Sequence, residues 1–180
     1  MEIVYSLLIL LIIACLIIIC YVFYYNKLQD CKLKIDEAES IIDESLREKY
    51  DLIVTIKNLI TSNINDKINF KDIDELKEQN ISNFDLDRKL SEYKTLILKI
   101  NDDYIELDKN KEFKDYLNQI KRADEKISAA KKFYNNYITI SNELVRKIPS
   151  NIVAKINNIE IKNFFDGKDM NDNDFNDFKL

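Results

Sequence analysis

The chain has 180 residues, a net charge of -5, and one glycine and one proline, Gly167 and Pro149. So few helix breakers favour long helices and argue against β-sandwiches, barrels and Gly-rich phosphate-binding loops. The absence of histidine excludes Ser-His and Cys-His nucleophiles and most zinc and iron sites. The acidic balance argues against nucleic-acid binding. We therefore expect no enzymatic activity, no catalytic residues, no cofactor and no metal site.

The N-terminal segment is predicted to be a transmembrane anchor. No charged side chain lies between Glu2 and Lys27, and residues 3–25 are almost wholly apolar. About 20 apolar residues are enough to cross the hydrocarbon core of a bilayer. The C-terminal end of the run carries aromatic residues that fit the membrane interface, namely Tyr21, Tyr24 and Tyr25. We assign residues 1–25 to the anchor, which contacts the lipid bilayer through residues 3–25.

Two other interpretations of this segment fit less well. A cleaved signal peptide needs a basic N-terminal region and a small-residue cleavage site, and the sequence has neither. Ile12-Ile13-Ala14-Cys15 is similar to a lipoprotein cleavage box, but the apolar run continues ten residues past Cys15. The cysteines Cys15, Cys20 and Cys31 have neither a disulfide pattern nor metal-ligand spacing.

The basic residues next to the anchor predict its orientation. Lys27, Lys32 and Lys34 follow the apolar run, whereas only Glu2 precedes it. The positive-inside rule therefore places the short N-terminus outside and everything after Lys27 in the cytoplasm. Three lysines can also attract anionic lipid, but this is fewer than the usual lipid-binding cluster.

An apolar stripe at helical spacing continues beyond the anchor, from Asn26 to about Thr61. No helix breaker separates it from the anchor, so the two can form one continuous rod. Its members are Leu28, Ile35, Ala38, Ile42, Leu46, Ile53, Ile56 and Ile60. A short helix is expected inside the polar stretch that follows, near residues 70–79.

Two further stripes predict two more helices. The first consists of Leu86, Leu90, Tyr93, Ile97, Ile100, Tyr104 and Leu107. The second, within residues 112–148, consists of Phe113, Leu117, Ile120, Ile127, Tyr134, Ile138, Val145 and Ile148, and neighbouring Ala123, Ala130, Tyr137 and Leu144 widen it. A broad apolar face is typical of a helix packed in a multi-helix bundle. The short polar link Asp108–Lys111 predicts that the two helices are antiparallel neighbours.

The C-terminal region has clear stop signals. Pro149 is expected to end the last long helix, and Ser150 or Asn151 to cap a short helix that begins near Ile152. The segment after Gly167 is acidic and Asn-rich, which predicts disorder. The domain organisation is thus an anchor over residues 1–25, a cytoplasmic helical bundle over 26–166 and an acidic disordered tail over 167–180.

The last long helix and the segment after it carry a family pattern. The residues concerned are Phe113, Leu117, Ile127, Ala130-Lys131, Tyr134-Asn135, Ile138, Asn142, Pro149-Ser150-Asn151-Ile152-Val153-Ala154 and Phe164-Phe165, with Asp43 and Asp51-Leu52-Ile53 fitting less tightly. This pattern resembles the LemA family of bacterial membrane proteins. The resemblance implies an N-terminal single-pass anchor, an antiparallel up-and-down four-helix bundle and no established catalytic residues.

The chain also departs from the family pattern. Asp124 and Lys131 replace Glu and Arg, Ser141 stands where a second Tyr is usual, and Ile148 stands where Phe is usual. Val54 and Ile105 occupy positions where the family tends to have proline. We therefore expect the helices to continue through these two positions, where the family pattern has a break.

Three groups of side chains are candidates for a functional surface. Tyr134-Asn135 can form a recognition surface, although the simpler interpretation is a core tyrosine with a satisfied hydroxyl beside a solvated asparagine. Asp124 and Lys131, seven residues apart, can form an internal polar pair or a ligand site, although the simpler interpretation is that both flank the core and reach water. The acidic end of the third helix, Asp102, Asp103, Glu106 and Asp108, opposes the helix dipole and can bind a basic partner or simply face solvent.

These observations favour a structural or interaction protein that presents its helical domain to an unidentified protein partner, with self-association also possible. The alternative is a signalling or stress-response accessory to a membrane enzyme such as a protease. In that case the anchor itself recognises the partner, and Ala14, Cys15 and Cys20 mark its packing face. Carboxylate chemistry is disfavoured because no two acids share an apolar stripe.

Overall fold

The computed structural model describes residues 1–63, 70, 73, 76, 81–104, 107 and 109–165. All regular elements within these ranges are helices: α1 (Glu2–Asn63), α2 (Asn83–Asp103), α4 (Lys111–Arg146) and α5 (Ser150–Ile156). The predicted all-α class with a long apolar N-terminal helix is confirmed. The predicted tail over 167–180 and most of the short helix near 70–79 lie outside the described residues.

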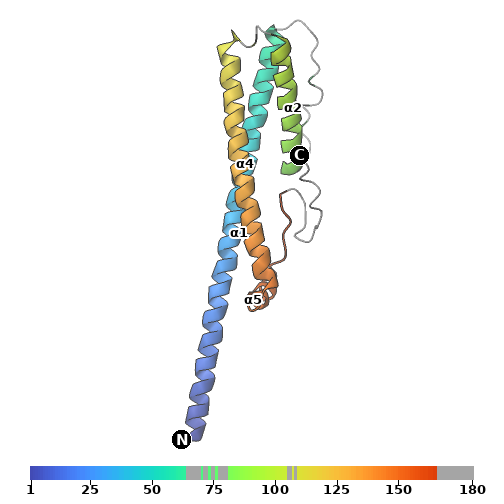
Figure 1. Ribbon diagram of the computed structural model, residues 1–180. Helices are drawn as coiled ribbons and strands as arrows, with labels where there is room; N and C mark the ends of the chain where they lie inside the picture. The colour runs from blue at the N-terminus through green and yellow to red at the C-terminus, as the bar shows by residue number, and fades with distance from the viewer. Residues whose placement is uncertain are drawn as a thin grey trace. The chain divides into compact units, whose positions relative to one another are not determined.

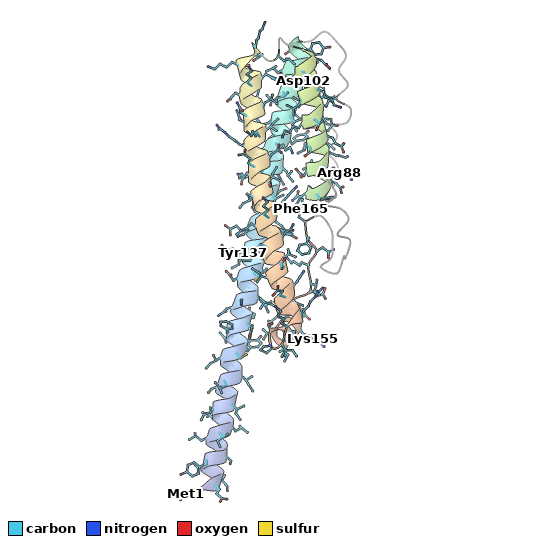
Figure 2. The ribbon with its side chains drawn as sticks, viewed as in Figure 1. Met1, Arg88, Asp102, Tyr137, Lys155 and Phe165 are labelled. Atoms are coloured by element: carbon cyan, nitrogen blue, oxygen red, sulfur yellow. The ribbon has the colours of Figure 1, made fainter. Side chains whose placement is uncertain are left out.

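α1 is one continuous helix from the anchor to Asn63, and it passes Val54 without a break. Every member of its predicted apolar stripe, from Leu28 to Ile60, is buried. The apolar N-terminal part behaves differently: its most apolar 18-residue window has a mean hydropathy of 3.3 and is wholly exposed. Figure 2 shows the side chains at this end, next to Met1, projecting away from the helix. α1 is therefore long and apolar enough to cross a membrane.

The chain divides into two compact units. Unit 1 comprises Met1–Glu37 and Phe133–Leu180, and unit 2 comprises Ala38–Lys132. Each unit takes one part of α1 and one part of α4, so each has its own apolar core.

In unit 2 the second half of α1, the whole of α2 and the first part of α4 lie side by side (Figure 1). Asp87 on α2 pairs with Lys131 on α4, and Lys94 on α2 pairs with Asp124 on α4. Residue numbers thus rise along α2 while they fall along α4, so the two helices run antiparallel, as the short link between them predicts. The core between the helices includes Ile53, Ile56, Leu90, Ile97, Phe113 and Ile120. The four-helix up-and-down arrangement stays a prediction.

Side-chain caps determine where α2 and α4 begin. The Ser82 hydroxyl oxygen accepts a hydrogen bond from the Asp85 amide at 3.1 Å, and the Asn110 side-chain oxygen accepts from the amides of Glu112 and Phe113. Such caps satisfy amides at a helix start that have no partner within the helix. α2 ends at Asp103, before Tyr104 and Leu107. The expectation of a missing break at Ile105 falls on a residue that lies outside the described ones.

In unit 1 the first part of α1, the last part of α4 and α5 enclose a small core of Leu28, Cys31, Leu144, Val153 and Ala154. Tyr21, Tyr24 and Tyr25 pack against it. In Figure 1, α5 is seen nearly end-on beside the end of α4, so its axis crosses the direction of that helix. The prediction that Ile148 belongs to the apolar face of the last helix was wrong. α4 ends at Arg146, and Ile148 is 81% exposed.

Candidate functional site

The most unusual residue of unit 2 is Lys49, a lysine whose side chain is only 1% exposed. It lies on α1 between Leu46 and Ile53, at the three- and four-residue spacing of the apolar stripe. Its backbone position therefore forces the side chain toward the core. An ammonium group there must be paired and hydrogen-bonded, because burying an unpaired charge is very unfavourable.

The partners of Lys49 lie on α2 and α4. Its Nζ lies 2.7 Å from Asp124 Oδ1 on α4 and 3.5 Å from Asp87 Oδ1 on α2. It also donates to the Ser91 hydroxyl oxygen at 3.2 Å. An ammonium group has three N–H donors, and each of them can be directed at one of these oxygens.

Both carboxylates hold a second lysine. Lys94 Nζ lies 2.5 Å from Asp124 Oδ2, and Lys131 Nζ donates to Asp87 Oδ2. The five side chains Lys94, Asp124, Lys49, Asp87 and Lys131 form one connected set, which we call the charge network. Three lysines and two aspartates leave it with one net positive charge. Because its members come from α1, α2 and α4, the charge network links these helices to one another.

The lysines control the ionisation of Asp124. Burial alone would raise the pKa of its carboxyl, but the hydrogen bonds and charges of Lys49 and Lys94 outweigh burial and hold the pKa below its usual value. Asp124 is therefore ionised throughout the neutral range. A carboxyl with a lowered pKa is a poor general acid, since catalytic acids and bases work best with a pKa near the operating pH.

An open groove of about 420 Å³ runs between α2 and α4 beside the charge network. Its wall includes Asp87, Lys94, Asp124 and Lys131, with the hydroxyls of Ser91, Thr95 and Ser128. The Ser91 hydroxyl donates to the carbonyl of Asp87, one helical turn back, while it accepts from Lys49. The charged groups of the groove and the Ser91 hydroxyl are thus engaged with one another.

Asp124 and Lys131 do belong together, but not as a direct pair. Each is about a quarter exposed at the edge of the core, as the flanking interpretation predicts, and each also forms an ion pair with another helix. Lys49, Asp87 and Lys94 were missed. Lys49 carries a visible signal, since it is a charged residue in the register of an otherwise apolar stripe. The two acids come from different helices, so no single stripe could have revealed them.

Tyr134 and Asn135 lie in unit 1. Tyr134 is 9% exposed, its hydroxyl lies 3.5 Å from the carbonyl oxygen of Asn163, and its ring meets Phe165 edge to face. Its interpretation as a core residue with a satisfied hydroxyl is confirmed. Asn135 is not simply solvated, because its side-chain oxygen accepts from the backbone amide of Phe165 at 2.9 Å.

Asn142, seven residues further along α4, also binds backbone groups of the segment after α5, and it makes two hydrogen bonds. Its side-chain amide donates to the carbonyl of Lys162 at 2.8 Å, and its side-chain oxygen accepts from the amide of Lys162 at 2.9 Å. Asn135 and Asn142 together hold the backbone of residues 162–165 along α4. The repeated Asn therefore has a structural function, which is to pair backbone groups of a segment outside any helix.

The remaining candidates are surface features or caps. Asp102 and Asp103 are exposed, and Glu106 and Asp108 lie outside the described residues. Lys27 and Lys32 are exposed, and a hydrogen bond to Glu37 raises the pKa of Lys34. The capping prediction for Ser150 and Asn151 was wrong. α5 begins at Ser150 without a side-chain cap, and the Ser150 hydroxyl donates back to the carbonyl of Lys147.

The cysteines occupy two environments. Cys15 is exposed on the apolar part of α1 and Cys20 is half-buried, whereas Cys31 is buried in the core of unit 1. Burial, with a contribution from Asp30, raises the pKa of the Cys31 thiol. Within the part of the chain that the structure describes, no three His, Cys, Asp or Glu side chains gather in a way that could hold a metal ion.

Comparison with known proteins identifies a family. The sequence model of the LemA family matches residues 38–176, a range that includes the charge network, Asn135 and Asn142. Neither the curated proteins nor the solved structures gave a match.

Proposed function

The chain belongs to the LemA family, and on this premise we propose that it is a single-pass membrane protein whose helical domain has a structural or protein-interaction role. The observation that carries the proposal is the continuity of α1. One helix joins a fully exposed apolar segment to a domain with a polar surface and an ordered core.

Exposed isoleucine and leucine side chains support the anchoring. Leaving one such side chain in water rather than burying it costs about 1.5–3 kcal/mol. The apolar part of α1 exposes many of them in succession, including Leu7, Leu8, Ile9, Leu10, Leu11, Ile12, Ile13, Leu16, Ile17, Ile18 and Ile19. A bilayer removes this cost along the whole segment, since residues 3–25 are long enough to span it.

We place the domain after Lys27 in the cytoplasm of a bacterial cell. The lysines on the C-terminal side of the apolar segment support this orientation. Reporter fusions at Leu180 test it. A fluorescent protein at this position should fluoresce and an alkaline phosphatase should be inactive. An active phosphatase, which requires export, would contradict the orientation.

An interaction role, rather than catalysis, is supported by the chemistry of the charge network. Its carboxylates are engaged with lysines from other helices, and the pKa of Asp124 is lowered rather than shifted toward neutrality. Charges used in this way hold helices together. The outer surface of the domain is then available to a protein partner or to a second copy of the chain.

Crosslinking in native membranes, followed by affinity capture, tests the interaction role. A matched variant replaces residues 3–25 with an unrelated apolar helix of the same length. If the domain recognises the partner, both chains should capture the same protein. Capture by the natural anchor alone would favour the second candidate, an accessory subunit that meets a membrane enzyme such as a protease through its transmembrane helix. Capture of no protein above an anchor-only control would contradict both.

A further inference from the structure

We propose that α5 forms a second membrane contact, in which Ile148, Ile152 and Ile156 insert into the headgroup region of the bilayer that α1 crosses. The inference rests on the proposed anchoring. It adds a surface of the folded domain that binds lipid directly.

Two isoleucines of α5 form an exposed apolar row, and a third exposed isoleucine, Ile148, precedes the helix. Ile152 and Ile156 are four residues apart on α5, which places them on the same face of the helix. They are 57% and 61% exposed, and Ile148, four residues before Ile152, is 81% exposed. The other face of α5 packs against the protein, because Val153 and Ala154 are buried in the core of unit 1.

The position of α5 matches the end of the membrane segment. The Asn157 side-chain amide, directly after α5, donates to the Tyr21 hydroxyl oxygen at 3.2 Å. Tyr21 lies near the C-terminal end of the apolar run, and Tyr24 and Tyr25 pack against the same core as Val153. Interfacial helices insert their apolar face about 5–10 Å into the boundary between headgroups and acyl chains. α5 therefore lies at the depth where an interfacial helix belongs.

The basic residues near α5 and the direction of its axis both favour a lipid surface as the partner of the exposed isoleucines. Basic residues accompany the row, with Arg146 and Lys147 before it and Lys155 within α5. An apolar face next to Lys and Arg suits a surface that contains anionic lipid. Figure 2 labels Lys155 on α5, beside the end of α4. Because the axis of α5 crosses that of α4 (Figure 1), α5 can lie along the membrane surface while α1 passes through it.

A depth measurement with tryptophan tests the proposal, since the chain contains no tryptophan. Three variants of the full chain, each with one tryptophan, are reconstituted into vesicles of phosphatidylcholine and phosphatidylglycerol that carry lipids brominated at shallow or deep acyl positions. Ile152→Trp reports on α5, and Leu10→Trp reports on the anchor. Leu33→Trp is the matched control, because Leu33 is 67% exposed on α1 but lies about 18 Å along the helix from Tyr21.

Shallow bromines should quench Ile152→Trp at least about threefold more strongly than Leu33→Trp, as expected for an interfacial helix. Deep bromines should quench Leu10→Trp. Quenching of Leu10→Trp with no excess at Ile152→Trp would overturn the second contact but leave the anchor in place. No quenching at either position would overturn the anchoring itself.

The same variants also distinguish lipid from protein as the material that covers the exposed isoleucines. If Ile152→Trp emits as a buried tryptophan but resists both quenchers, protein covers it and the proposal is wrong. Emission that becomes solvent-like on dilution to one chain per vesicle would then identify a second copy as the cover. Emission that dilution does not change would identify a segment of the same chain.

Discussion

Lys49 is charged at a position where the helical repeat of α1 otherwise has apolar side chains. It is tolerated because Asp124, Asp87 and Ser91 surround its ammonium group. In such a network the loss of one partner is worse than the loss of the central charge, because it leaves a buried ion with too few counter-charges. The two kinds of substitution should therefore differ clearly in their effect on stability.

Asp124→Asn should destabilise the chain more than Lys49→Met. Breaking a fully buried pair costs about 3–5 kcal/mol, but Asp124 is 26% exposed and solvent screens it, so we expect about 1–2 kcal/mol. Lys49→Met keeps the volume and leaves both aspartates paired with Lys94 and Lys131, so it should cost less than about 1 kcal/mol. Thermal unfolding of the full chain in detergent measures both. A larger loss for Lys49→Met would show that its charge is itself a net source of stability.

The stabilisation by Asp124 should depend on pH in one direction. Its pKa is lower in the folded chain than the ordinary value of 3.8, so folding favours the ionised form. The contribution is fully present above the ordinary value and is lost as the pH falls through the folded pKa. The gap in unfolding midpoint between the parent and Asp124→Asn should therefore be constant near neutrality and shrink in strong acid. A gap that widens in acid would contradict the lowered pKa.

Tyr134→Asp should damage folding rather than a surface. The new carboxylate would lie in the core of unit 1, and Lys131, the cation one helical turn away, already pairs with Asp87. Burying an unpaired charge costs several kcal/mol. Asn136→Asp is the matched control, because it adds the same charge at an exposed position of α4. We expect a lower unfolding midpoint and faster proteolysis for Tyr134→Asp alone. Equal melting of the two variants would make Tyr134 a surface contact.

At the scale of elements, the side chains of α4 position the chain that follows α5. Asn142 is fully buried and makes two hydrogen bonds to the backbone of Lys162. Each is worth about 1 kcal/mol, and losing the partner of a buried group costs more than that. Asn142→Ala should therefore loosen this segment while α4 itself stays folded.

Trypsin provides the readout for Asn142→Ala, because it cleaves after exposed lysines and Lys162 is exposed. We expect cleavage after Lys162 to accelerate several-fold relative to the parent chain, in proportion to the population of the open form. Asn136→Ala, which removes an exposed asparagine from the same helix, should leave the rate unchanged. Equal rates for the two variants would show that Asn142 does not hold the segment.

The helices themselves could largely be predicted from the sequence, because burial follows the three- and four-residue spacing along one helix. The first stripe, from Leu28 to Ile60, is buried throughout. The ends of helices could not be predicted as well. The start of α4 depends on a cap from Asn110, and Ile148 leaves the core because α4 has already ended. These outcomes depend on local hydrogen bonds that a repeat does not contain.

For the whole molecule, the interactions between helices were the hardest to anticipate. The sequence singled out Asp124 and Lys131, but their partners Lys49, Asp87 and Lys94 are 30 to 75 residues away along the chain. Likewise, nothing near Asn157 indicates that it reaches Tyr21. A stripe shows which side of a helix is buried, whereas these contacts depend on the register between helices, which only the packed structure provides.

The fragment 26–166 should fold without the anchor. The fully buried part of α1 begins at Leu28, so the fragment keeps the buried residues of both units and loses only Tyr21, Tyr24 and Tyr25 from the edge of the unit 1 core. We expect it to be soluble and strongly helical by far-UV circular dichroism, with a cooperative thermal transition. A spectrum dominated by coil would show that the domain needs the membrane segment to fold.

The central claim is that the chain is held in the membrane by residues 3–25, and alkaline extraction of isolated membranes tests it most directly. High pH releases proteins bound only through charges, whereas a helix that spans the hydrocarbon core stays in the pellet. The full chain should remain in the pellet, and the fragment 26–166, expressed in the same cells, should be released. Release of the full chain by alkali would contradict the account.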